Sequence, residues 1–381
     1  MSTNTTITNG RNAVSAFTDG IRDRWADAPG WQRWIVYAAL FVIALLLPSD
    51  SIGQFMSPYT DWASVLFFPI GTFVVLAIGL NVVVGQAGLL DLGYIAFFAI
   101  GGYSMALLGT ELGLNFWEIL VVGVVLSAVS GVVLGGPTLR LRGDYLAIVT
   151  LGFGEIVRQT AENTPAIGGP RGIAGIPHPP SLDGVMIFGV DVFHYGVLDP
   201  RPYYYLLVVV ATAIIIFVKR WEKSRVGRAW AAIREDEDAA EVMGVPTFKF
   251  KLLAFAIGAS IGGAMGVVWA GKTISINPND FMFMLSATIL AAVVLGGSGN
   301  LPGVILGAFL VAWLPERFRG LSDYRIMVFG GALVVLMIFR PEGLLPSRRR
   351  KAELAEGTGG MGSLGAEVAG PETHAAEGAA K

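Results

Sequence analysis

The chain has 381 residues, of which 54% are hydrophobic and only 15% are charged, whereas soluble domains are about 25% charged. This composition excludes an ordinary soluble protein. The net charge of -2 gives no electrostatic reason to expect a nucleic-acid partner, and the lack of cysteine excludes disulfides and thiolate metal sites.

Apolar runs recur along the chain, and many are long enough to cross a bilayer, which needs roughly 20 apolar residues per helix. They predict an all-α fold: a polytopic membrane helix bundle of about ten transmembrane helices, one or more of them short or broken. The first run ends without a small-residue cleavage site, so it is expected to stay as a helix and not to be removed as a signal peptide. The predicted spans are 33–48, 63–85, 88–108, 116–135, 144–158, 203–218, 251–271, 281–297, 301–316 and 324–340.

Lys and Arg residues set the predicted orientation, because positively charged loops stay in the cytoplasm. With ten spans and the N-terminus inside, most of the 27 basic residues fall on the cytoplasmic side, as do both termini. The predicted parts are a cytoplasmic segment (1–32), a transmembrane domain (33–346) and a disordered cytoplasmic tail (347–381). Within the domain we expect an outer loop at about 160–202 and a cytoplasmic loop at about 219–250.

Two intramembrane carboxylates, Asp91 and Glu155, need a reason, because charges are costly in a bilayer. Each could face a water-filled pathway, together with its neighbours Tyr94 and Gly154, at a break that nearby glycines would permit. The structural alternative for Asp91 is that it satisfies the backbone of a broken helix. For Glu155 the alternative is an ion pair with Arg158, three residues later on the same helix.

The cytoplasmic loop is the most informative polar stretch. Residues 229–242 are rich in helix formers, and Gly244 followed by Val245 and Pro246 is a helix-stop signal. A short amphiphilic helix is therefore expected between basic flanks. It could be a solvated loop that only fixes topology, or it could contact a cytoplasmic partner.

Glycines at Gly258, Gly262 and Gly266 repeat every four residues and so share one helix face. Small residues at this spacing let membrane helices approach closely, so we expect helix packing here.

The segment that starts at Gly266 also matches the phosphate-loop pattern GxxxxGK[ST], through Gly271, Lys272 and Thr273. That motif binds phosphate where a glycine-rich loop joins a strand to a helix. Here the pattern ends an apolar helix, so no nucleotide site is predicted.

Several stretches together resemble the LivM-type permease of bacterial branched-chain amino acid ABC importers. In chain order they are NVVVGQAGLLDLGYIAFFAIGGY (81–103), PTLRLRGDYLAIVTLGFGEIVR (137–158), GGPRGIAGIP (168–177), SRVGRAWAAIREDEDAAEVMGV (224–245), VVLGGSGNLPGVILGA (293–308) and YRIMVFGGALVVLMIFRPEGLLP (324–346). The resemblance spans residues from about 65 to 346.

This resemblance implies a permease subunit in the bacterial inner membrane that imports leucine, isoleucine and valine. The implied partners are two ATP-binding subunits (LivG/LivF-like), a second permease chain (LivH-like) and an extracytoplasmic substrate-binding protein. ATP and Mg²⁺ would bind to the ATPase partners, so no cofactor is expected on this chain.

The resemblance also gives the cytoplasmic loop a role, since ABC importer permeases carry a coupling loop of the form EAA, three residues, then Gly. Asp238, Ala239, Ala240 and Gly244 fit, with Asp in place of Glu, whereas the later I-x-L-P element is absent. The departure suits the branched-chain amino acid and ribose permease family better than the maltose type. The expected coupling loop comprises Arg234, Glu235, Asp236, Asp238, Ala239, Ala240, Glu241 and Gly244.

Other functions remain open on the sequence alone. Relatives that carry urea or short amides are one alternative, and an ion-coupled secondary transporter that uses Asp91 or Glu155 as a relay is another. A membrane enzyme is not expected, because we find no cluster of catalytic polar groups, and the histidines (His178, His194 and His374) have no triad or metal-site spacing.

Overall fold

The computed structural model describes residues 30–49, 53, 56–57, 60–139, 141, 143–181, 186–187, 190–191, 194–196, 199–319, 327, 330–331, 334 and 343–345. The chain divides into two units, residues 1–52 and 53–381. In the first unit the described residues form helix α2 (Gly30–Leu46), whose apolar side chains, including Ile35 and Leu40, are exposed.

The second unit is helical apart from short strands within the described residues. Its first apolar stretch runs through α4 (Trp62–Val65), π-helical η1 (Leu66–Gly71), α5 (Thr72–Asn81) and π-helical η2 (Val82–Gln86). The other helices are α6 (Ile95–Glu111), α7 (Phe116–Thr138), α8 (Asp144–Asn163), α9 (Arg201–Glu222), α10 (Arg225–Glu235), α11 (Glu237–Val242), α12 (Thr247–Lys272), α13 (Phe283–Gly296) and α14 (Leu301–Arg317).

The connections at one end of α12 carry the short 3-10 helices η3 (Pro165–Ile167), η4 (Gly169–Arg171) and η5 (Pro278–Phe281). Strand β1 (Ile173–Ala174) pairs antiparallel with β4 (Ser275–Ile276), and β2 (Met186–Ile187) pairs antiparallel with β3 (Val190–Asp191). The β1–β4 pair joins the loop after α8 to the loop after α12, since Ile173 lies opposite Ile276.

Five described helical stretches are long and apolar enough to cross a membrane: Trp62–Gln86, Phe116–Thr138, Arg201–Glu222, Thr247–Lys272 and Pro278–Gly296. The chain is therefore an all-α, multi-pass membrane protein. The predicted count of about ten spans is not confirmed. The predicted span at 324–340 lies almost wholly outside the described residues, as do the segment 1–29 and the tail 347–381.

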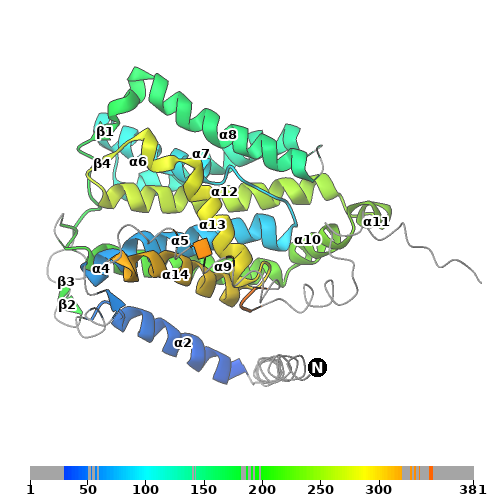
Figure 1. The fold of residues 1–381 in the computed structure, drawn as a ribbon, viewed down its shortest axis with the longest axis horizontal. Helices are drawn as coiled ribbons and strands as arrows, with labels where there is room; N and C mark the ends of the chain where they lie inside the picture. Colours follow the sequence, from blue (N-terminus) through cyan, green and yellow to red (C-terminus); the bar gives the residue numbers. More distant parts are fainter. Residues whose placement is uncertain are drawn as a thin grey trace, which may run out of the picture. The chain divides into compact units, whose positions relative to one another are not determined.

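Helix α12 forms the centre of the second unit, with α6, α7 and α5 running alongside it (Figure 1). Helix α12 lies close to α6 and α7 because glycines, which have no side chain, occupy the contact positions. A Cβ on Gly101 of α6 would lie 2.1 Å from the Gly263 carbonyl oxygen, and a Cβ on Gly263 would lie 2.1 Å from the Ser127 hydroxyl of α7. The three backbones therefore meet with almost no side-chain layer between them.

The glycines Gly258, Gly262 and Gly266 line a second close approach on α12. A Cβ on Gly258 would lie 2.6 Å from Val83, one on Gly262 would lie 3.1 Å from Phe97, and one on Gly266 would lie 2.2 Å from the Phe98 carbonyl oxygen. These glycines thus face η2 and α6.

Several helix boundaries differ from the sequence predictions. Residues 87–94 are not helical, so the predicted span at 88–108 begins only at Ile95. Helix α8 continues past residue 158 to Asn163, which shortens the predicted outer loop. The predicted loop at 219–250 loses residues at both ends, because α9 ends at Glu222 and α12 begins at Thr247.

Candidate functional site

A break in the helical backbone surrounds Asp91. The π-helix η2 ends at Gln86, Gly88 takes a positive φ of 74°, and α6 begins at Ile95. Asp91 Oδ1 accepts a hydrogen bond from the Gly93 amide at 2.9 Å, and the Leu92 amide donates to Thr150 Oγ1 of α8 at 3.0 Å. Side chains thus replace part of the missing helical hydrogen bonding at this break.

Three of the predicted pathway residues lie inside the chain. Asp91 and Tyr94 are fully buried, and the Tyr94 hydroxyl donates to the Gly258 carbonyl at 2.9 Å. Gly154 is also buried, since a Cβ there would lie 3.2 Å from Gly93 Cα. In the described residues, Asp91 Oδ2 has no hydrogen-bond partner. The Oδ1 bond to the Gly93 amide is one that the structural alternative for Asp91 requires, and a pathway role for Asp91 stays a prediction.

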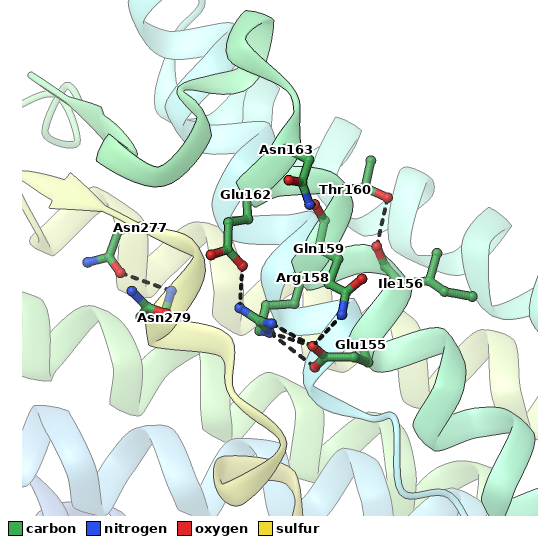
Figure 2. Close-up of polar contacts among 9 residues, drawn as sticks. All are labelled: Glu155, Ile156, Arg158, Gln159, Thr160, Glu162, Asn163, Asn277 and Asn279. Carbon is green, nitrogen blue, oxygen red and sulfur yellow. Dashed lines mark hydrogen bonds and ion pairs between the residues drawn. The ribbon is translucent and has the colours of Figure 1, made fainter.

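Glu155 lies in a different environment. Helix α8 is continuous from Asp144 to Asn163, so Glu155 is not at a break. Arg158 Nε donates to both Glu155 oxygens at 3.0 and 3.1 Å, and its Nη1 donates to Glu162 Oε2 at 2.7 Å (Figure 2). The ion pair between Glu155 and Arg158 that the spacing predicts is present, and the structure adds a second carboxylate.

The C-terminal turns of α8 carry a partly exposed polar face that the sequence analysis did not identify. Gln159 Nε2 donates to Glu155 Oε1 at 3.1 Å, and Asn163 Nδ2 donates to the Gln159 carbonyl at 2.9 Å (Figure 2). Glu155 and Glu162 are 37% and 39% exposed. We call Glu155, Arg158, Gln159, Thr160, Glu162 and Asn163 the α8 polar face. A spacing of three and four residues along 155–163 could have revealed it.

The N-terminal half of α8 exposes apolar side chains instead, since Tyr145 is 71% and Ile148 is 64% exposed. A further apolar residue, Ile156, is 64% exposed within the polar half. The exposed surface of α8 therefore changes from apolar near Asp144 to polar near Asn163.

The loop between α9 and α12 forms two helices, not the single amphiphilic helix that was expected over 229–242. Ser224 caps α10 through its hydroxyl, which accepts from the Val226 amide at 3.1 Å. Asp236 takes an extended conformation and caps α11, since its Oδ1 accepts from the Ala239 amide at 2.9 Å. The single-helix prediction was wrong because this Asp acts as an N-cap, which ends one helix and begins the next.

Helices α10 and α11, joined at Asp236, are called the α10–α11 hairpin, and it packs on the N-terminal end of α12 through buried contacts. Trp230 Nε1 donates to the Phe250 carbonyl at 2.7 Å, and Trp230 also stacks on Trp221 of α9. The buried Lys251 pairs with Glu237. Among the predicted coupling residues, Ala240 is buried and Arg234 is partly buried, whereas Glu235, Asp236, Asp238, Ala239, Glu241 and Gly244 are exposed.

The phosphate-loop pattern has no loop in the structure. Residues Gly266 to Lys272 are helical and belong to α12, so the backbone amides that would hold phosphate are bonded within the helix.

The family model for the branched-chain amino acid transport system permease component matches residues 64–339. The chain belongs to this family. The permease is 41% identical to the high-affinity branched-chain amino acid transport permease protein LivM of Escherichia coli K12, over 84% of this chain and 77% of the relative. It is 44% identical to LivM of Salmonella typhimurium, over 75% and 70%. It is also 24% identical to LivH of Escherichia coli K12, over 72% of this chain and 91% of the relative. No solved structure matches the permease.

The last residues of the permease's hairpin, where α11 leads into α12, are exposed and apolar. Val242 and Met243 are 88% and 82% exposed, and they precede Gly244, which takes a positive φ of 85°. The Gly244 amide donates to the Glu241 carbonyl at 2.9 Å, which closes the turn. The C-terminal end of α11 thus presents a small apolar surface beside acidic side chains.

Proposed function

We propose that this permease is the membrane subunit of an ATP-driven importer for leucine, isoleucine and valine. The main support is its similarity to LivM over 84% of this chain, together with the family match to residues 64–339. It would transport without hydrolysing ATP, with ATP and Mg²⁺ held by partner chains and no cofactor of its own.

The proposed setting is the bacterial inner membrane, with both termini and the α10–α11 hairpin in the cytoplasm. The concentration of Lys and Arg between residues 219 and 251 supports this orientation. The permease domain would extend from residue 33 to 346, between a cytoplasmic segment (1–32) and a cytoplasmic tail (347–381).

The proposed partners are two ATP-binding subunits, a LivH-like second permease and an extracytoplasmic binding protein. The α10–α11 hairpin would carry the contact with an ATP-binding subunit, since Val242 and Met243 expose apolar surface that a groove in a partner can bury. Closure of the ATPase pair would then move the hairpin and favour one facing state of the pathway.

We place the α8 polar face along the translocation pathway. Glu155 is 11 residues from the start of α8, about 16 Å along a helix about 30 Å long, so it lies near the middle of the helix. Although α8 is not among the five stretches that are long and apolar enough to cross a membrane, we place it across the bilayer, with Glu155 at mid-depth. A face with Glu155, Gln159 and Asn163 partly exposed at this depth and beyond is too costly to point at lipid. It must face water or another protein chain.

The charges on this face suit a zwitterionic amino acid. Glu155 and Glu162 flank Arg158, so the cluster carries more negative than positive charge and attracts an ammonium group. The exposed Ile148 and Ile156 offer apolar contact for an aliphatic side chain on the same helix. The site would be weak and shared with the partner permease, since part of each carboxylate already bonds Arg158.

The test is uptake by the importer reconstituted in vesicles with all of its partner subunits. We expect radiolabelled leucine to enter only with ATP, and Glu155→Gln to lower uptake several-fold. Glu111→Gln is the matched control, because Glu111 is an exposed glutamate at the end of α6.

Three results would contradict the proposal. Uptake that continues without ATP and collapses with an ionophore would identify an ion-coupled transporter. Uptake of urea or a short amide without leucine would identify the other branch of the family. Full activity of Glu155→Gln would remove the α8 polar face from the pathway.

A further inference from the structure

Arg234 reaches from the α10–α11 hairpin into the membrane helices through a notch made by glycines. Its Nη1 donates a hydrogen bond to the Gly85 carbonyl near the end of η2. On one side, a Cβ on Gly88 would lie 2.9 Å from Arg234 Cγ, and on the other, a Cβ on Gly299 would lie 2.8 Å from Nη1. The side chain therefore keeps this position because both neighbouring residues are glycine, and a Cβ at either of them would displace it.

A second hydrogen bond, between α5 and the α13–α14 loop, lies beside the Arg234 side chain. Asn81 Oδ1 of α5 accepts from the Gly299 amide at 2.8 Å, across the loop between α13 and α14. A Cβ on Gly85 would lie 1.9 Å from Asn81 Oδ1 and 2.5 Å from the Gly299 nitrogen, so Gly85 must be glycine for this bond to form. Asn81, Gly85 and Gly299 thus form one contact into which Arg234 inserts.

The electrostatics of this contact favour a cation. The Gly85 carbonyl is among the last of η2, and such carbonyls point out of a helix end with partial negative charge. A guanidinium there supplies a charge-assisted hydrogen bond, which is stronger than one between neutral groups.

The stretch that receives Arg234 contains polar atoms with unused bonding capacity. Asn81 Nδ2, Gln86 Oε1 and Asp91 Oδ2 are buried without a hydrogen-bond partner in the described residues. Buried groups of this kind are costly, so their occurrence within 11 residues distinguishes this stretch from the regular helices around it. These three residues lie on η2 and its borders or in the non-helical segment 87–94 that precedes α6.

We infer that Arg234 is a positioning residue that fastens the hairpin to η2, directly before the break at 87–94, and to the α13–α14 loop. Displacement of the hairpin then moves both segments together, because Gly85 and Gly299 meet the same guanidinium. This inference rests on the proposed import function, since it assigns the route by which an ATPase partner would act on the membrane helices.

The first test measures leucine molecules transported per ATP hydrolysed by the complete importer in vesicles. Arg234→Gln should lower this ratio about tenfold, since a hydrogen bond to a charged group contributes that order of free energy. Arg234→Lys should fall between it and the wild type, because an ammonium can still donate to one carbonyl. Arg228→Gln should keep the wild-type ratio, because Arg228 is an exposed guanidinium on the same helix with no polar contact among the described residues.

The other side of the contact gives an independent variant. Gly299→Ala places a methyl group against Nη1 and Gly85, and its backbone φ of 82° strains any other residue. The double variant Arg234→Gln/Gly299→Ala should transport no less leucine per ATP than the worse of the two single variants, because both substitutions break the same contact. A double variant whose loss in leucine transported per ATP equals the product of the two single-variant losses would show that the contacts are independent, and would overturn the inference.

A cross-link provides a test that a folding defect cannot imitate. The chain has no cysteine, and a Cβ on Gly88 would lie 3.3 Å from Arg234 Cβ, close to the separation of about 3.5 to 4.5 Å in disulfides. The pair Gly88→Cys/Arg234→Cys should form an intrachain disulfide on oxidation with copper phenanthroline. Its transport per ATP should be low when reduced and should rise when oxidised.

The outcomes separate the two proposals. Absence of ATP-driven leucine uptake by the wild type would overturn the import function. Wild-type uptake with an unchanged ratio in Arg234→Gln, or a disulfide that forms without raising the ratio, would overturn the role of Arg234 alone. Failure of the disulfide to form in a double variant that keeps the thermal midpoint of the single variant Gly88→Cys would contradict the placement of Arg234 beside Gly88.

Discussion

Replacement of Gly266 by alanine tests the close packing of α12 against α6. The new Cβ would lie 2.2 Å from the Phe98 carbonyl oxygen and 2.7 Å from the Gly102 nitrogen. Both are backbone atoms, so the two helices would have to separate by roughly 1 Å to reach an ordinary contact distance. Overpacking of this kind costs about 1 to 3 kcal/mol, and the higher helix propensity of alanine offsets up to about 1 kcal/mol. We expect a net loss of about 2 kcal/mol.

The matched control is Gly152→Ala on α8, where no described atom lies within 4 Å of the new Cβ. That variant gains helix propensity without a clash, so it should be as stable as the wild type or more stable. Tryptophan fluorescence during heating in mild detergent should place the Gly266→Ala midpoint about 5 °C or more below that of Gly152→Ala. Gly262→Ala should fall between them, because its nearest atoms belong to the Phe97 and Tyr94 side chains. Equal midpoints for Gly266→Ala and Gly152→Ala would refute the packing argument.

Three further predictions concern the hairpin. Gly244→Val should lower the leucine transported per ATP while membrane insertion stays intact. The reason is that a positive φ of 85° costs a branched residue about 1 to 2 kcal/mol or more, which changes the conformation of the turn. Uptake and ATPase assays on the same vesicles measure this ratio. Asp236→Ala removes the N-cap of α11 and should cost about 1 kcal/mol, seen as faster hydrogen exchange of the α11 amides, whereas exchange in α7 should not change. Lys251→Met should lower the thermal midpoint more than Lys249→Met, because Lys251 is a buried ion-pair partner and Lys249 is exposed; an equal effect would contradict the pairing with Glu237.

Sequence patterns predicted the parts of the fold in which one property decides the structure. The apolar run of α12 predicts a helix because 26 residues contain few polar groups, and the glycine spacing in it predicts a close approach. The break near Asp91 was also expected, because Gly88 and Gly93 allow backbone conformations that a helix excludes.

Patterns failed where a polar residue had two possible roles. Asp236 lies in an acidic run that resembles an exposed helix surface, yet its side chain caps α11 and divides the hairpin. Likewise Gln159 and Asn163 resemble the start of a loop, yet they continue α8 for another turn. The contact of Arg234 with Gly85 and Gly299 could not be predicted at all, because it joins residues separated by 149 and 65 positions and leaves no local periodicity.

The glycines on both sides of α12 restrict how the molecule can move. At Gly101, Gly263 and Ser127 the backbones of α6, α12 and α7 meet with almost no side chains between them. A tilt of α12 alone would therefore open voids along its contacts with α6 and α7. Helices α6, α7 and α12 are therefore expected to travel as a single rigid body during a transport cycle. The bending would then fall on two non-helical stretches, residues 87–94 before α6 and residues 297–300 between α13 and α14.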